Sequence, residues 1–360
     1  MFFGIILTMS KYCLLVFLIV SDMVWAMVPT ALEMRGPFPI MSTPYLDDGA
    51  VDCDGLVREA DWIIRCGSSG AIWCQSNDSI DLLTTEEKYR GFDVCAQAFE
   101  GTGTVLALGA NGTNTAEMLE IAAEIERVAT RHPATKLAIV SRPPDDVRSE
   151  DELEKAWDSL GAVVRRPVIF QTFCSTNTPT PSVEMMVRLA KKHPKVFGYI
   201  KEEAAGNSAN ERMIQEGAAK PTIKTVFSGW GGWQWLYQLR HCGSEGLITE
   251  RVAYLPLIMR VWREYERGDP DGKMTDAFAL YRLLIDQRNF PGGGLRDYSL
   301  YFLEKEGIFK NRLSRRYANA RETEGGSFGS GKAWKLDNVE ISELQKAELD
   351  ILFAKIQEAL

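Results

Sequence analysis

From Gly36 onward, short apolar runs alternate with longer segments in which apolar residues recur every three or four positions. The short runs predict β-strands, and the longer spacing predicts amphipathic helices, as in Leu56, Ala60 and Ile63. The segments predicted to be strands are Phe38–Thr43, Ala71–Gln75, Val105–Leu108, Lys136–Val140, Val168–Gln171, Val196–Ile200, Lys224–Phe227 and Gly246–Thr249.

Each of these eight strands is followed by a helical segment, which is the order of a parallel α/β protein. Residues 36–268 have the size of a closed (β/α)8 TIM barrel, which needs about 250 residues. We therefore predict the α/β class with a (β/α)8 barrel. A doubly wound open sheet is the alternative, because it has the same order of elements.

Residues 269–360 are predicted to form a C-terminal helical extension of the barrel. Pro256–Arg267 is expected to be the eighth barrel helix, and the extension is expected to contain helices at Thr275–Asp286 and Asp297–Lys305. Ser342 and Gln345 have the spacing of a capping box that would start a last helix. Its apolar stripe is predicted to lie in the core or at a subunit contact and consists of Leu349, Leu352, Phe353, Ile356 and Leu360.

Residues 1–35 are interpreted as a separate leader. From Met9 they have the parts of a cleaved signal peptide: the basic residue Lys11, the apolar run Cys13–Val20, and a cleavage site at Val24–Ala26. Equally, translation could begin at Met27 or Met34. We expect a cytoplasmic protein, with export through the signal peptide as the alternative.

Composition narrows the possible partners. The formal net charge of −8 argues against nucleic acid and anionic membranes, because both repel an acidic protein. The seven cysteines include no Cys-x-x-Cys pair and are expected to be reduced thiols. The three histidines, His132, His193 and His241, fall near predicted helix ends, where we expect them to cap carbonyls. No metal site is predicted.

Lys201 follows the apolar run Val196–Ile200 in the segment VFGYIKEE. In a (β/α)8 barrel, catalytic groups stand at the carboxyl ends of the strands, which is where Lys201 would lie. Burial favours the neutral form of an amine, and a neutral amine can add to a carbonyl to form a Schiff base. The alternative is that Lys201 is the first solvated residue of a loop.

Several segments in order resemble the dihydrodipicolinate synthase and N-acetylneuraminate lyase superfamily of class I aldolases. They are STPYLDDGAVD (42–52), LLTTEEK (82–88), LALGANGTNTAEMLEIA (106–122), GYIKEE (198–203) and the pair Ser228–Gly229. The resemblance extends from about residue 37 to residue 256.

This resemblance implies a barrel, usually a homotetramer, that binds a 2-oxo acid such as pyruvate as an imine on the lysine of strand six. By position that lysine is Lys201. The imine accepts the electrons released on bond cleavage, so that neither a metal nor an organic cofactor is implied. A homo-oligomer, tetramer or dimer, is expected.

The family holds the substrate carboxylate with a Gly-Thr-Thr-Gly-Glu turn after strand two, and residues 75–79 match it here. Ser76 and Asn77 retain a hydroxyl and an amide and are predicted to bind the carboxylate. Asp78 adds a negative charge that an anion site would not favour.

Three departures concern the reaction. The family's proton-transferring tyrosine is replaced by Gln171, which would line the substrate site but whose amide does not titrate. Thr176 replaces an arginine, and 141–144 (SRPP) replace a two-tyrosine motif. These losses argue against dihydrodipicolinate synthesis. Arg142 could bind a second carboxylate or a sugar-acid hydroxyl, or be a surface arginine.

The sequence therefore predicts a Schiff-base lyase, an aldolase or dehydratase, acting on a 2-oxo acid such as a 2-keto-3-deoxy sugar acid. Gly229 and Ile248 are expected to shape the pocket. The lost tyrosine supports a second hypothesis, a non-catalytic barrel that binds a small acid. The candidates to replace the tyrosine are Tyr45, Tyr199, Thr249 and Glu250, and the sequence does not choose among them.

Overall fold

The structure, a computed structural model, describes residues 32–75, 78, 80–172, 178–204, 208–232, 234–250, 252–268, 272–286, 295–318 and 331–360. Met34–Leu360 forms one compact unit. Its strands are β1 (Gly36–Pro39), β2 (Gly70–Trp73), β3 (Val105–Gly109), β4 (Lys136–Ser141), β5 (Val168–Gln171), β6 (Tyr199–Glu202), β7 (Thr225–Ser228), β8 (Gly246–Thr249), β9 (Leu313–Tyr317) and β10 (Trp334–Asn338).

The helices follow these strands in the expected alternation. They are α2 (Cys53–Arg65), α3 (Thr85–Ala98), α4 (Thr115–Arg131), α5 (Glu150–Val163), α6 (Val183–Lys192), α7 (Ser208–Ala218), α8 (Trp235–His241), α9 (Leu255–Glu266), α10 (Lys273–Asp286), α11 (Leu295–Lys305) and α12 (Glu343–Ala359), with short 3₁₀ turns η2 (Ile80–Leu82), η3 (Trp230–Gly232) and η4 (Val252–Tyr254).

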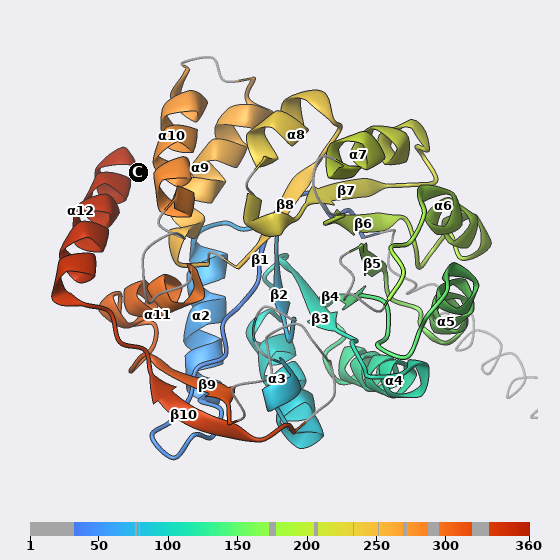
Figure 1. The fold of residues 1–360 in the computed structure, drawn as a ribbon, viewed down its shortest axis with the longest axis horizontal. Helices are drawn as coiled ribbons and strands as arrows, with labels where there is room; N and C mark the ends of the chain where they lie inside the picture. The colour runs from blue at the N-terminus through green and yellow to red at the C-terminus, as the bar shows by residue number, and fades with distance from the viewer. Residues whose placement is uncertain are drawn as a thin grey trace, which may run out of the picture. The chain divides into compact units, whose positions relative to one another are not determined.

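Strands β1 to β8 form a closed parallel barrel. Their order is β1-β8-β7-β6-β5-β4-β3-β2. The sheet closes where Ile40 bridges Ile72 in parallel and the N–H of Met41 donates to the carbonyl of Ile72 at 2.7 Å. Figure 1 shows the strands at the centre with the helices around them. The predicted barrel is confirmed, and the open-sheet alternative is wrong.

Alternate strand residues face opposite sides of the barrel wall. Val226 and Leu247 pack in the large core between the strands and the helices. Phe227 follows Val226, and Phe38 pairs with Ile248, which follows Leu247. Phe38 and Phe227 therefore face inward, and their rings meet with centroids 5.1 Å apart. A Cβ atom on Gly70 would collide with the Phe38 ring, so this position needs glycine. The barrel interior is thus a packed core below its carboxyl end.

Helix starts follow the expected capping chemistry. At α3, Thr84 and Glu87 form a complete capping box. Ser149 and Ser182 cap α5 and α6 by accepting the N–H three residues ahead. Each cap fixes where the chain leaves a strand-end loop and enters a helix, and so fixes the length of the loop that faces the barrel mouth.

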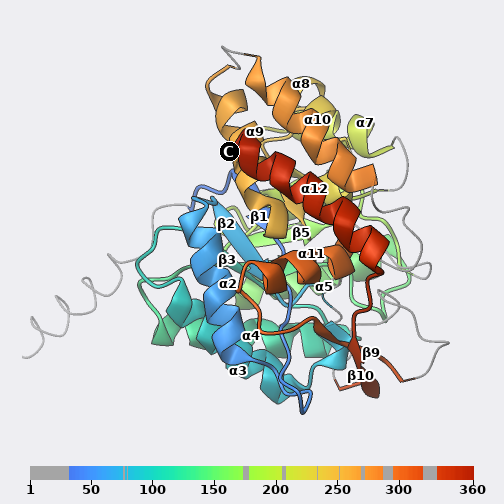
Figure 2. The ribbon, with the colours of Figure 1, turned by 90° about the vertical axis from the view of Figure 1, so that its left-hand side faces the viewer.

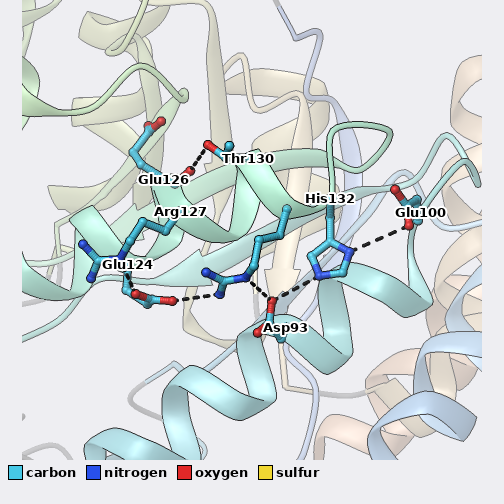
Figure 3. A network of polar contacts seen from close by, with 8 residues as sticks. Asp93, Glu100, Glu124, Glu126, Arg127, Thr130 and His132 are labelled. Atoms are coloured by element: carbon cyan, nitrogen blue, oxygen red, sulfur yellow. Dashed lines mark hydrogen bonds and ion pairs between the residues drawn. The ribbon is translucent and has the colours of Figure 1, made fainter.

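A polar network joins α3 and α4 on the outside of the barrel (Figure 3). Asp93 Oδ1 accepts from Arg131 Nε at 2.9 Å and lies 3.1 Å from His132 Nε2. His193 likewise lies 2.8 Å from Asp158. Both histidines stand at helix ends as predicted, but their rings contact carboxylates. The expected carbonyl capping by these two rings is wrong.

Beyond the barrel, the helices expected after residue 268 are present as α10, α11 and α12. The capping box of Ser342 and Gln345 is confirmed. Leu349, Phe353 and Ile356 from the predicted stripe are buried. Phe353 stacks on Phe302 of α11 at 4.3 Å, so this part of the stripe is core. Figure 2 shows α12 lying along the side of α10 and α11.

The extension also contains an antiparallel hairpin, β9–β10, that the sequence analysis did not predict. Arg315 of β9 anchors it, with a guanidinium that lies between the rings of Tyr45 and Trp334, at 4.9 and 4.2 Å. The same group donates to Glu87 Oε1 at 2.6 Å and to the Gly49 carbonyl at 2.8 Å. The hairpin therefore ties the C-terminal region to the loop after β1 and to the first turn of α3.

Among the described residues, none of the helices is both long enough and apolar enough to cross a membrane. The described cysteines are free thiols, as expected, and are Cys53, Cys66, Cys74, Cys95 and Cys242.

Candidate active site

Lys201 lies inside β6, one residue before its end, and its side chain is 1% exposed. The strand was predicted to end at Ile200. In the structure the strand begins at Tyr199 instead of Val196. The reason is that the N–H groups of Val196 and Phe197 both bond to the His193 carbonyl in a turn, and that Gly198 has φ +122°. The interpretation of Lys201 as a solvated loop residue is wrong.

Glu203 shares the barrel-mouth face of β6 with Lys201. The two residues are two positions apart in extended chain, which places both side chains on one side. Lys201 Nζ lies 3.0 Å from Glu203 Oε1, and the glutamate side chain is 7% exposed. The lysine therefore meets a buried carboxylate directly.

Two further donors hold this carboxylate. Gln171 Nε2 donates to Oε2 of Glu203 at 2.7 Å, and the N–H of Trp230 donates to Oε1 at 3.0 Å. Gln171 is also the cross-strand partner of Lys201. Burial of a carboxylate is costly unless its oxygens are hydrogen-bonded, and these contacts meet that requirement.

Gln75 extends the network to the end of β2. Its Nε2 donates to Oε1 of Gln171 at 2.7 Å, and both amides are buried. Because Gln171 accepts from Gln75 and donates to Glu203, its orientation is set by both neighbours. The chain Gln75–Gln171–Glu203–Lys201 thus joins the carboxyl ends of β2, β5 and β6.

Gly229 makes room for Glu203. A Cβ atom at Gly229 would collide with Cγ of Glu203 and lie 2.8 Å from its Cδ. The next residue, Trp230, has φ +48° and donates its indole N–H to the Ala204 carbonyl at 3.2 Å. This strained backbone aims the Trp230 N–H at Glu203, and such strain is common at functional sites.

A second strained residue lies at the other end of the network. Cys74, directly before Gln75, has φ +63°. Its carbonyl comes so close to β3 that a Cβ atom at Gly109 would collide with it. Burial raises the pKa of the Cys74 thiol to about 12, so it stays protonated near neutral pH and is a poor nucleophile.

The opposite face of β6 is held by Glu202. Its carboxylate accepts from Thr172 Oγ1 at 2.9 Å and from Arg212 Nε at 3.0 Å. The Thr172 hydroxyl oxygen in turn accepts the N–H of Glu203 at 2.6 Å. Thr172 and Arg212 therefore fix the backbone on which Lys201 and Glu203 stand.

In the turn after β2, Ser76 and Asn77 lie outside the described residues. Asp78 is buried, and its carboxylate accepts from the backbone N–H of Thr43 at 2.8 Å and from the hydroxyl of the same residue. Trp73 Nε1 donates to that hydroxyl at 3.2 Å. Thr43 thereby engages both oxygens of Asp78, the charge that the sequence left unexplained.

Arg142 follows β4 and is 1% exposed, so the alternative of a surface arginine is wrong. Its Nη2 lies 3.0 Å from Asp145 Oδ1, and its backbone N–H donates to Asn111 Oδ1 at 3.1 Å. Ser141 and Phe170 are cross-strand partners. The residues that follow them, Arg142 and Gln171, therefore lie side by side at the carboxyl ends of β4 and β5. The structure thus keeps a buried cation at the same end of the barrel as Lys201.

Ile248 is fully buried on β8 and pairs with Phe38. Among the proposed substitutes for the tyrosine, Tyr199 has its ring 5.1 Å from Lys224 Nζ, which precedes β7. It therefore lies toward the amino end of the strands. Tyr45 packs under Arg315. Thr249 ends β8 and Glu250 follows it, two strands from Lys201.

Sequence reasoning missed Glu203 and Gln75 as site residues. For Glu203 a signal was present, since strand alternation that turns Lys201 inward also turns the residue two positions later inward. Gln75 was matched to a glycine of the family turn, and nothing in the sequence indicates that its side chain reaches β5. Within the described segments, no group of three His, Cys, Asp or Glu residues could hold a metal ion.

A family model confirms what these features indicate. Residues 33–274 match the dihydrodipicolinate synthetase family. The chain belongs to this family. Its members are class I aldolases and lyases, and the family assignment makes this protein an enzyme of that type.

The relatives of this family member are distant. A 4-hydroxy-tetrahydrodipicolinate synthase from Gluconacetobacter diazotrophicus is 26% identical over 246 residues, which are 68% of this chain and 78% of the relative. Dihydrodipicolinate synthase from Rhodopseudomonas palustris superposes with a TM-score of 0.72 at 16% identity, covering 91% of this chain and 100% of that one. A sialic acid aldolase from Ruminococcus gnavus reaches 0.70 at 14% identity, covering 90% and 97%.

Proposed function

We propose that this protein is a Schiff-base lyase acting on a 2-oxo acid, with Lys201 as the residue that forms the imine. The observation that carries the proposal is the place of Lys201: an almost fully buried amine at the carboxyl end of β6, in contact with one carboxylate. Active sites of such barrels lie at this end. An amine there can add to the C2 carbonyl, and the imine stabilises the carbanion formed on cleavage.

The substrate is proposed to be a 2-keto-3-deoxy sugar acid, which the enzyme would cleave by retro-aldol reaction or dehydrate. Ser76 and Asn77 would hold its C1 carboxylate, and Gly229 and Ile248 would shape the pocket. Gln171 would line the site and orient the groups around Lys201. Arg142, buried beside Asp145, would bind a distal hydroxyl or a second carboxylate.

The choice of substrate lies between the two activities named for the relatives, which are a 4-hydroxy-tetrahydrodipicolinate synthase and a sialic acid aldolase. Gln171 and Arg142 replace the residues that the family's dihydrodipicolinate synthases use at these positions. The side chains around Lys201, such as Gln171 and Glu203, are polar and buried. They suit a sugar acid with several hydroxyl groups better than an aldehyde derived from an amino acid.

Borohydride trapping tests the proposal. The protein is incubated with pyruvate and sodium borohydride, digested, and analysed by mass spectrometry. We expect a reduced pyruvyl adduct on Lys201 that is absent from Lys201→Arg, while Lys224→Arg, which changes a half-buried lysine outside the site, keeps it. The absence of any adduct across a panel of 2-oxo acids would reject the lyase proposal.

The second candidate is a barrel that binds a small acid without catalysis. Gln171 motivates it, because this amide stands where the family has its proton-transferring tyrosine and does not titrate. In that case the acid would bind reversibly, with no adduct at Lys201. Isothermal titration with pyruvate beside the trapping experiment separates the two functions.

We also propose a homo-oligomer, tetramer or dimer, as in the family. Size-exclusion chromatography with light scattering would give the mass, and a monomer of 40.3 kDa would reject this part.

A further inference from the structure

We propose that Glu203 is the catalytic acid and base of this enzyme, taking the place of the tyrosine that its family uses for proton transfer. The inference rests on the proposed Schiff-base function and names the second reacting group of the same site. Its basis is the contact between Glu203 Oε1 and Lys201 Nζ at 3.0 Å, within the reach of direct proton transfer.

The remaining contacts of Glu203 suit this role. Gln171 engages Oε2, while Oε1 faces Lys201 and the Trp230 N–H. One oxygen is thus held by an amide that does not titrate, and the other is directed at the nitrogen where the imine forms. The geometry gives the carboxylate a fixed direction, which a proton-transfer group requires.

The steps balance with this one group. Glu203 first takes a proton from the Lys201 ammonium, and the free amine attacks C2 while the carbonyl oxygen receives that proton. The nitrogen of the carbinolamine then gives a proton to Glu203, which passes it to the hydroxyl. Water leaves, and the nitrogen lone pair forms the C=N bond of a cationic iminium.

The carboxylate, again ionised, then faces that cation and stabilises it. In cleavage it takes the proton of the C4 hydroxyl: the C3–C4 bond breaks, its electrons pass to the iminium nitrogen, and C4 leaves as a carbonyl. The protonated glutamic acid then protonates C3 of the enamine. With pyruvate the same group removes and returns a methyl proton.

Among the described residues, Glu203 is the titratable side chain that contacts Lys201 Nζ. Glu202 points to the other face, toward Arg212. Gln171 occupies the tyrosine position and cannot titrate. The structure therefore supplies the lost function from the neighbouring strand position, and Gly229 provides the space that the glutamate side chain needs.

The test is exchange of the methyl protons of pyruvate in D₂O, followed by proton NMR. This exchange needs the imine and a base but no knowledge of the natural substrate. We expect Glu203→Gln to lower the exchange rate by about 10²- to 10⁴-fold, while a borohydride adduct still accumulates on Lys201, more slowly than in the wild type. Glu154→Gln, at a surface pair with Arg188, is the matched control and should exchange like the wild type.

Two more variants keep the test decisive if Glu203→Gln is poorly folded. Glu203→Asp retains a carboxylate with shorter reach and should show an intermediate rate. Glu203→Ala should be inactive and regain at least tenfold activity with added formate, a rescue that a purely structural role would not show. Exchange in Glu203→Gln within threefold of the wild type, or no formate rescue, would overturn the assignment.

The failure of this inference differs from the failure of the proposed function. If the wild type forms the Lys201 adduct but exchange does not depend on Glu203, only the role of Glu203 is lost. If the wild type forms no adduct, both are lost.

Discussion

Gly229 at the end of β7 lies directly against the side chain of Glu203 after β6. Its own N–H donates to the carbonyl of Glu202 at 3.1 Å, and any Cβ at this position would overlap Glu203. The absence of a side chain at one residue thus permits the position of the carboxylate at another.

Gly229→Ala is therefore expected to reduce pyruvate exchange by about 10- to 100-fold, since small displacements of a catalytic group cost factors of this size. Gly217→Ala on α7 is the control, because a Cβ there meets nothing within 4 Å. It should leave exchange unchanged and stabilise the fold by about 0.5 to 1 kcal/mol. Equal exchange in both variants would show that Glu203 needs no such space.

Gln171→Leu removes the middle of the polar chain. Gln75 and Glu203 would each lose a buried hydrogen-bond partner. We expect a loss of about 2 to 3 kcal/mol in the free energy of unfolding, measured in urea. Gln97→Leu, on the exposed side of α3, should change stability by less than about 0.5 kcal/mol. A similar small effect at Gln171 would contradict the network.

Arg315→Ala tests the hairpin anchor. Burial opposes ionisation of Glu87, but the hydrogen bonds from Arg315 and Thr84 outweigh it and lower the pKa of Glu87. Removal of the arginine should cost about 3 kcal/mol or more, because buried partners are left unpaired. Arg188→Ala, at an exposed pair, should cost less than about 1 kcal/mol.

The ion pair between Arg315 and Glu87 should also make the stability of the fold depend on pH. A lowered carboxyl pKa stabilises the fold above the unfolded value, about 4.3 for glutamate, and this contribution disappears as the pH falls through the lower folded value. The stability difference between the wild type and Arg315→Ala should therefore shrink as the solution is acidified below pH 4. A difference that stays constant would rule out Glu87 as the partner that matters.

Glu216 on α7 should change the stability of the fold with pH in the opposite direction. Desolvation, together with the nearby charge of Glu202, raises its pKa well above the usual value. Its contribution is complete below the unfolded pKa and is lost as the pH rises through the folded pKa. Glu216→Gln should match the wild type near pH 4 and be more stable at pH 8, in thermal melts. A variant that is less stable at pH 8 would show that the ionised form is favoured.

The sequence by itself determined the barrel and the lysine. Apolar runs of strand length, alternating with helical periodicity, predict eight βα units, and the length of the segment favoured a closed barrel over an open sheet. Order along the chain then placed Lys201 at strand six. Local caps such as Thr84 and Ser342 depend on neighbours three residues away, so they too could be predicted.

The tertiary structure alone decided which side chains surround Lys201. Gln75, Gln171 and Gly229 belong to three other strand ends, and their meeting at Glu203 depends on the closure and register of the barrel, which no local pattern specifies. The hairpin β9–β10 was missed for the same reason. Its strands are stabilised by Arg315 contacts to residues more than 200 positions earlier, and distant contacts leave no periodic signal in the sequence.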